Sequence, residues 1–118
     1  MRYMLLVYGD EQILSESERE ACYVESTELA NDLAAKGSYL AASPLYPSAT
    51  ATSVRVRDDR RLVTDGPFAE TREQLGGYFL IQAENLDQAI EVAERIPMAR
   101  RGTIEIRPVL ELAGLPTS

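Results

Sequence analysis

Short apolar stretches alternate with amphipathic ones along this chain, and their order predicts the fold. Residues 2–8 are apolar on both parities, which is typical of a central strand covered on both faces. Ser15 and Glu18 form a capping-box pattern, which predicts a helix over 16–36 that ends at Gly37. The other predicted elements are strands at 38–46, 50–57, 61–64, 78–83 and 103–109, and a helix between Asn85 and Pro97.

This order predicts an α+β fold, a ferredoxin-like βαββαβ unit with a β-hairpin inserted midway. One sheet face would pack on the helices through side chains such as Val7, Val54, Phe79, Ile81 and Ile106. The stripe on the first helix would contain Cys22, Ser26, Leu29 and Leu33, and that on the second Leu86, Ala89, Ile90 and Ala93. Leu6, Tyr78 and Leu80 would point away, so we expect a second copy to cover them in a homodimer.

Length and composition narrow the class of protein. The 118 residues predict one domain over 1–112 and a short tail over 113–118. One cysteine forms no internal disulfide, and the first apolar run is too short for a signal peptide or a membrane span. We therefore expect a cytoplasmic protein without a membrane segment.

Charge and residue content exclude several chemistries. The net charge of −7 disfavours binding to nucleic acid or to an anionic membrane. Because the chain has no histidine, mechanisms with a histidine base and zinc sites built from nitrogen and sulfur ligands within one chain are excluded. Binding of a metal by oxygen ligands alone stays open, although the acidic residues match no calcium-loop spacing. We predict no metal site and no cofactor.

One long segment resembles a known family. Residues 62–81, LVTDGPFAETREQLGGYFLI, are similar to the signature of the DGPF family within the YCII-related superfamily, as are residues 2–10, 51–57 and 105–109. The resemblance extends to about residue 110 and implies a dimeric α+β barrel with a cleft between sheet and partner. Some relatives have a His–Asp pair proposed as a catalytic dyad, which a chain without histidine does not have.

Several residues in and around this segment are candidates for a site. Asp65 either accepts amides of its own turn or is a general base or ligand acceptor at a strand end. Glu70 and Arg72 are either solvated loop residues or the polar rim of the same cleft, where Arg72 could pair with a substrate carboxylate. Tyr8 and Tyr78 belong either to the core or interface or to a ligand cavity as hydroxyl donors.

Two functions remain open at this point. The first is small-molecule binding in a cleft near the turn of residues 65–68, with Asp65 or Glu70 supplying any acid–base chemistry. The second is a non-catalytic regulatory or interaction module, linked to transcription through a protein partner, as the family resemblance implies. A deep cleft holding a carboxylate of raised pKa would favour the first, and an exposed apolar patch the second.

Overall fold

The computed structural model describes residues 1–116 and confirms the predicted order of elements. The elements follow the chain as β1 (Arg2–Gly9), α1 (Glu16–Ala35), β2 (Tyr39–Pro44), η1 (Ser48–Thr50), β3 (Thr52–Arg57), β4 (Arg60–Asp65), β5 (Gln74–Gln82), α2 (Leu86–Arg95), η2 (Pro97–Arg100) and β6 (Thr103–Pro108). Here η marks a short 3-10 helix. Neither α-helix is long and apolar enough to cross a membrane.

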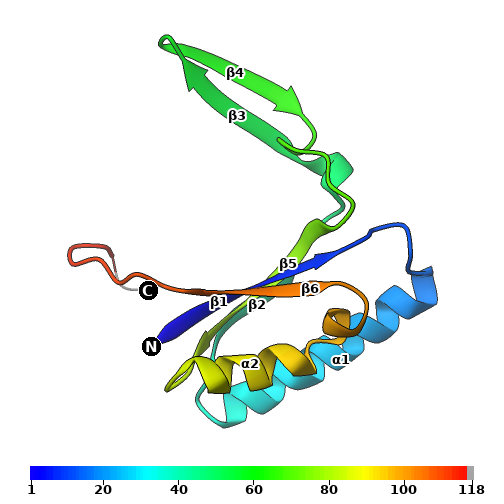
Figure 1. Ribbon diagram of the computed structural model, residues 1–118, viewed down its shortest axis with the longest axis vertical. Coiled ribbons are helices and arrows are strands. Elements are labelled where there is room, and N and C mark those ends of the chain that lie inside the picture. The colour runs from blue at the N-terminus through cyan, green and yellow to red at the C-terminus, as the bar shows by residue number, and fades with distance from the viewer. Residues whose placement is uncertain (117–118) are drawn as a thin grey trace.

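Four strands form an antiparallel sheet in the order β2-β5-β1-β6, and α1 and α2 both lie on one face of it (Figure 1). This is the strand order of a ferredoxin-like unit once the β3–β4 hairpin between β2 and β5 is set aside. The predicted α+β fold with an inserted hairpin is therefore confirmed.

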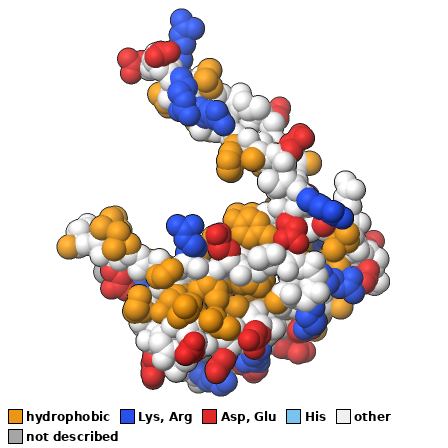
Figure 2. All heavy atoms as spheres, in the orientation of Figure 1, with side chains coloured by type: hydrophobic (Ala, Val, Ile, Leu, Met, Phe, Trp, Pro, Cys, Tyr) orange, Lys and Arg blue, Asp and Glu red, His pale blue; other side chains and the backbone are white. Residues whose placement is uncertain are grey.

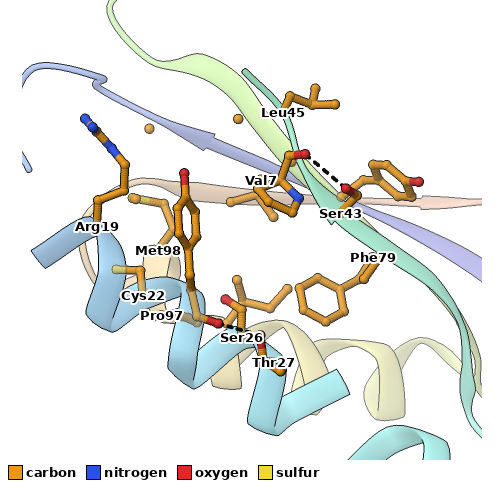
Figure 3. A pocket seen from close by; sticks show the side chains of 18 of the residues that line it. Val7, Arg19, Cys22, Ser26, Thr27, Ser43, Leu45, Phe79, Pro97 and Met98 are labelled. Carbon is orange, nitrogen blue, oxygen red and sulfur yellow. Dashed lines mark hydrogen bonds between the residues drawn. The ribbon is translucent and has the colours of Figure 1, made fainter. Parts of the chain in front are cut away.

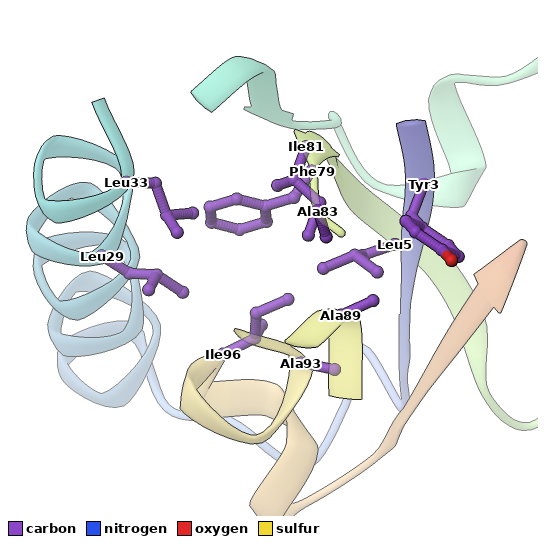
Figure 4. Close-up of a cluster of buried hydrophobic side chains, with 10 residues drawn as sticks. All are labelled: Tyr3, Leu5, Leu29, Leu33, Phe79, Ile81, Ala83, Ala89, Ala93 and Ile96. Carbon is purple, nitrogen blue, oxygen red and sulfur yellow. The ribbon is translucent and has the colours of Figure 1, made fainter. Parts of the chain in front are cut away.

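The core lies between the sheet and the two helices (Figure 4). It is built from alternate residues of the central strands, together with Leu29 and Leu33 of α1 and small residues of α2. Its buried members are Tyr3, Leu5, Leu29, Leu33, Phe79, Ile81, Ala83, Ala89, Ala93 and Ile96. Because strand side chains alternate between faces, Leu6, Tyr78 and Leu80 belong to the opposite, open face, as predicted.

Two expectations about apolar positions were wrong. Val54 lies in the hairpin rather than in the four-stranded sheet, and 61% of its surface is exposed. On α2 the two small residues are buried, whereas Leu86 and Ile90 remain exposed. A periodic stripe identifies one side of a helix but not how much of that side a neighbouring element covers.

Local signals at the helix ends were predicted correctly. The Ser15 hydroxyl accepts the Glu18 amide at 3.1 Å, and the Glu18 carboxylate accepts the Ser15 amide at 3.0 Å. Gly37 follows α1 with a φ of +76°, a conformation that glycine adopts without a steric penalty. Asn85 caps α2 by accepting the amide of Gln88 at 2.9 Å.

Strand β5 begins earlier than predicted, at Gln74 rather than at Tyr78. The pairing with β1 shifts between Val7 and Tyr8, where Gly76 is the extra residue of a bulge. Within the predicted tail, residues 113–116 form no helix or strand, and residues 117–118 lie outside the described residues.

The β3–β4 hairpin stands clear of the sheet and helices (Figure 1, Figure 2). Its two-residue turn places Asp58 and Asp59 at φ 50° and 61°, the left-handed conformations of a type I′ turn. The radius of gyration is 16.0 Å, larger than the roughly 13–14 Å of a compact chain of this length. The protomer thus exposes both the hairpin and the open face of the sheet.

Candidate functional site

A cavity of about 640 Å³ lies between α1, the β2–β5 side of the sheet and η2 (Figure 3). We call it the α1 cavity. Its volume falls in the range of roughly 300–1,000 Å³ that is usual for small-molecule sites. It borders the hydrophobic core and shares Phe79 and Ile96 with it.

The cavity exists because one stripe of α1 carries small side chains. Leu29 and Leu33 reach the sheet and close the core. The neighbouring stripe, with a residue every four positions, is too short to fill the space to the sheet. Its members, all of which line the cavity, are Cys22, Ser26, Ala30 and Ala34.

The walls of the α1 cavity are mainly apolar. Val7, Ala42 and Phe79 line it from the sheet, and Pro97 and Met98 line it from η2. The backbone of Gly9 lets Met98 approach closely, because a β-carbon there would come within 2.8 Å of the Met98 sulfur. A larger residue at Gly9 would therefore displace one wall.

Arg19 and Cys22 lie at one end of the cavity and Phe79 at the other (Figure 3). Two lining hydroxyls already donate to main-chain carbonyls: Thr27 to Tyr23 at 2.8 Å, and Ser43 to Pro44 at 3.1 Å. The Arg19 guanidinium is bound less completely. Its contact among the described residues is one donation from Nη2 to the Glu11 carbonyl at 3.3 Å.

A polar depression adjoins the mouth of the α1 cavity and shares Asp10, Glu11 and Gln74 with it. The Glu11 carboxylate accepts the Ser48 amide at 2.7 Å and its hydroxyl at 2.5 Å. Asp10 accepts the amide of Gln12 at 2.9 Å. Glu11 thus holds the loop after β1 against η1, whereas Asp10 accepts a hydrogen bond within that loop.

Two ion pairs connect α1 to the segment around η2. Glu25 binds both terminal nitrogens of Arg100, at 2.9 and 3.1 Å, and this hydrogen bonding lowers the pKa of the Glu25 carboxyl. The pKa of Glu18 is also lowered, first by the Ser15 amide, then by the Ser15 hydroxyl and by Arg101. Both shifted carboxyl pKa values move downward, opposite to the direction expected of a general acid.

The sequence match that decides the family extends over nearly the whole chain. The model of the YCII-related domain matches residues 1–113. The chain belongs to the YCII-related family. This confirms the resemblance that its sequence indicated.

Two proteins that resemble this YCII-related chain match it over more than nine-tenths of its length. An uncharacterized protein of Rhizobium meliloti (strain 1021) is 35% identical, with 92% of each chain covered. A solved structure with a similar fold is 5-chloro-2-hydroxyhydroquinone dehydrochlorinase (TftG) from Burkholderia phenoliruptrix AC1100, in complex with 2,5-dihydroxybenzoquinone. The TM-score is 0.58 at 15% identity, with 93% of this chain and 94% of TftG covered. At that identity the likeness shows the fold alone.

The turn that the sequence singled out lies away from both hollows of this YCII-related domain. Asp65 ends β4 in the projecting hairpin and is exposed. Next to it, the Gly66 amide donates to Ala51 at 2.7 Å, and the Ser53 hydroxyl donates to Gly66 at 2.8 Å. Asp65 and Glu70 are not among the described residues that line either hollow.

The other candidates are divided among three places. Arg72 borders the polar depression, 3.9 Å from Asp10, with its side chain almost fully exposed. Tyr78 contributes to the lining of the α1 cavity, although its parity is opposite to that of Phe79. Tyr8 lies on the same open sheet face as Tyr78. The structure therefore does not bring the five predicted site residues together.

Sequence reasoning missed Arg19 and Met98 and assigned Cys22 to the core. A usable signal was present: small residues at 22, 26, 30 and 34 follow one stripe of a helix that packs on a sheet. Such a stripe indicates space beside the helix. The opposite wall of the cavity comes from β1, β2, β5 and η2. The sequence around α1 does not indicate which residues these are.

Proposed function

We propose that this YCII-related domain binds a small organic molecule in the α1 cavity. The observation that carries the proposal is a preformed, mainly apolar hollow of about 640 Å³, with Arg19 at one end and further polar side chains along its lining. Ligand sites usually combine apolar walls with a small number of orienting polar groups. The ligand bound to TftG, a protein of similar fold, makes small ring compounds reasonable probes.

The proposed ligand site lies along α1 and not at the turn of residues 65–68. Asp65 is exposed on the hairpin, whereas Cys22, Ser26 and Ala30 are partly buried and line one hollow. Acid–base roles for Asp65 or Glu70 stay a prediction. The geometry favours binding in the α1 cavity because a ligand there would lose far more apolar surface to solvent.

A fragment screen by NMR tests the site directly. The probes are benzoate, benzamide and benzyl alcohol, which share one ring and differ in the polar group. Binding should shift the backbone amides of Cys22, Ala30 and Met98. Cys22, the single cysteine of the chain, should also be alkylated more slowly by iodoacetamide when a probe is bound.

A pair of variants makes the screen specific. Ala30→Leu adds volume to the wall of the α1 cavity and should abolish these shifts. Ala35→Leu makes the same change on an exposed position of α1 that is not among the described lining residues, and should leave them intact. Binding that survives Ala30→Leu, or shifts confined to other residues, would contradict the proposal.

We further propose that the domain is a homodimer in the cytoplasm. An open apolar sheet face and a projecting hairpin support the dimer, because isolated soluble chains rarely leave such surfaces uncovered. The free thiol of Cys22 fits a reducing compartment. A dimeric mass by light scattering at micromolar concentration is the expected result, and a monomeric mass would refute the dimer.

The second candidate function is a non-catalytic interaction module that acts through a protein partner, with a connection to transcription as one form of it. The observation that favours it is the exposure of large apolar side chains, among them Phe68 at 81% and Leu110 at 79%. If the chain is monomeric in solution, these side chains stay uncovered and this candidate gains weight. If it is dimeric and binds ring compounds at α1, the first candidate stands.

A further inference from the structure

Arg19 is the single cation among the described residues that line the α1 cavity. A guanidinium has five N–H donors, and the described residues satisfy Arg19 with one neutral carbonyl. The ion pairs of the described chain use other arginines, namely Arg2, Arg72, Arg95, Arg100 and Arg101. Arg19 is thus a half-buried charge that has no carboxylate partner within residues 1–116.

The two nearby carboxylates are directed to other groups. Glu11 binds the amide and hydroxyl of Ser48, and Asp10 binds the amide of Gln12. Both also line the polar depression, which Arg19 does not line. An anion entering the α1 cavity would therefore meet the guanidinium at the end where these acids are already engaged.

The remaining surface of the cavity is mainly apolar, although Ser26 and several tyrosines also line it. Phe79 and Val7 face the space away from Arg19 and Cys22, and Met98 lies near those two residues (Figure 3). The hydroxyls of Thr27 and Ser43 donate to their own main chain, so their protons are not free for a ligand. A bound molecule needs an apolar body for these walls and an acceptor for the donors of Arg19.

We infer that the α1 cavity takes a small, flat, singly charged organic anion, an aromatic carboxylate or an acidic hydroxyquinone, whose anionic oxygens are bound by Arg19. This inference rests on the proposed function and adds the chemical class of the ligand. The planar guanidinium can bind two oxygens of a carboxylate at once, while the ring lies against the apolar walls of the cavity. Binding is non-covalent, and no proton is transferred.

The test compares an anion with its neutral counterpart. Benzoate and benzamide have nearly the same shape, and at pH 7 the first is charged and the second is not. NMR titration of the unsubstituted chain should give tighter binding of benzoate. In Arg19→Gln, benzoate should bind roughly 10- to 100-fold more weakly, the usual value of a charge-assisted hydrogen bond, while benzamide changes little.

Two further variants exclude general effects of charge. Lys36→Gln removes one positive charge from the end of the same helix, outside the described cavity lining, and should leave the preference for benzoate unchanged. Arg19→Lys keeps the charge but not the planar fork, and should recover part of the affinity. Thermal unfolding of each variant checks that the fold is retained.

The outcomes separate the inference from the proposed function. If benzamide and benzoate bind equally, or if Arg19→Gln leaves their ratio unchanged, the anion class is wrong while ligand binding in the α1 cavity stands. If no probe shifts the lining amides of the unsubstituted chain, both fail. A preference for benzoate that is lost in Arg19→Gln alone supports both.

Discussion

The Glu11 carboxylate binds both the main-chain amide and the hydroxyl of Ser48, 37 positions along the chain. The same Ser48 hydroxyl lies 2.7 Å from the side-chain oxygen of Gln74 at the start of β5. This network joins the loop after β1, the short helix η1 and β5 at the mouth of the α1 cavity. It fixes the entrance through side chains rather than through strand pairing.

Replacing Glu11 should therefore loosen the entrance and destabilise the fold. Glu11→Gln keeps the shape but loses the charge-assisted hydrogen bonds, which at a half-buried site should cost about 1–2 kcal/mol in the free energy of unfolding. Urea unfolding measures the change. Glu20→Gln, an equal change at an exposed position of α1, should alter stability by less than about 0.5 kcal/mol.

A double-mutant cycle tests whether Glu11 acts through Ser48. Ser48→Ala should cost less in the Glu11→Gln background than in the unsubstituted chain, because the shared interaction is then already lost. Strictly additive effects would show that the two side chains stabilise the fold independently. That result would contradict a joint role at the cavity entrance.

Acid should remove the contribution of Glu25. Its pKa lies below the ordinary value of 4.5 because Arg100 donates to its carboxylate, so the folded state favours the ionised form. The resulting stability is fully present above that value and is lost as pH falls through the lower pKa of the folded state. The pair is largely exposed, so the contribution should be below about 1 kcal/mol.

The measurement is the difference in unfolding free energy between the unsubstituted chain and Glu25→Gln. It should be small and positive at pH 7, shrink as pH falls below 4.5 and through the lowered pKa of Glu25, and decrease at high salt. Glu28→Gln on the same helix is the control. A difference that stays constant with pH would show that the variant acts through packing and not through the ion pair.

Local patterns in the sequence were sufficient to predict the helices and strands and the residues at which the helices begin. Ser15 with Glu18 and Asn85 with Gln88 satisfy helix-end amides from three residues away, so the sequence nearby contains the whole signal. The period of two along residues 2–8 and 78–83 likewise divided their side chains correctly between the two faces of the sheet. These features depend on neighbours in the chain.

The site was predicted poorly because its parts come from distant segments. Arg19, Ala42, Phe79 and Met98 line one space, although up to 79 positions separate them. The sequence motif instead indicated the turn of residues 65–68, which begins at the end of the hairpin strand β4. The prediction that Val54 packs on the helices was wrong for a related reason. Alternation along a hairpin does not indicate whether that hairpin joins the main sheet.

Gly102 should tolerate no side chain. A β-carbon built there would overlap the Tyr8 carbonyl oxygen and crowd the α-carbon of Gly9, where the chain leaves η2 for β6. Both neighbours are backbone and cannot swing aside. Gly102→Ala should destabilise the fold by about 2 kcal/mol or more, as judged by thermal or urea unfolding.

Gly76 provides the matched comparison. Its nearest neighbour to an added β-carbon is the Val7 carbonyl at 3.9 Å, an ordinary contact distance. Gly76→Ala should therefore change the unfolding free energy by less than about 1 kcal/mol. If Gly102→Ala were as mild as Gly76→Ala, the close approach of the two backbones would not be a constraint on the fold.

The hairpin should contribute to the proposed homodimer through one face. Directly paired residues share a face, so Val54 and Val63 lie together, and Arg55 and Leu62 lie on the other side. Both valines are more than half exposed in the protomer. Because interface centres are apolar and depleted in charge, the valine face is the one expected to be covered by a second copy.

Val63→Asp should therefore shift the chain from dimer to monomer in analytical ultracentrifugation, with the dissociation constant raised at least about 10-fold by the charge in an apolar contact. Leu62→Asp, the same kind of change on the opposite face of the hairpin, should leave the dimer largely intact. Circular dichroism of both variants checks the fold. Equal effects of the two variants would show that the hairpin does not present a preferred face to its partner.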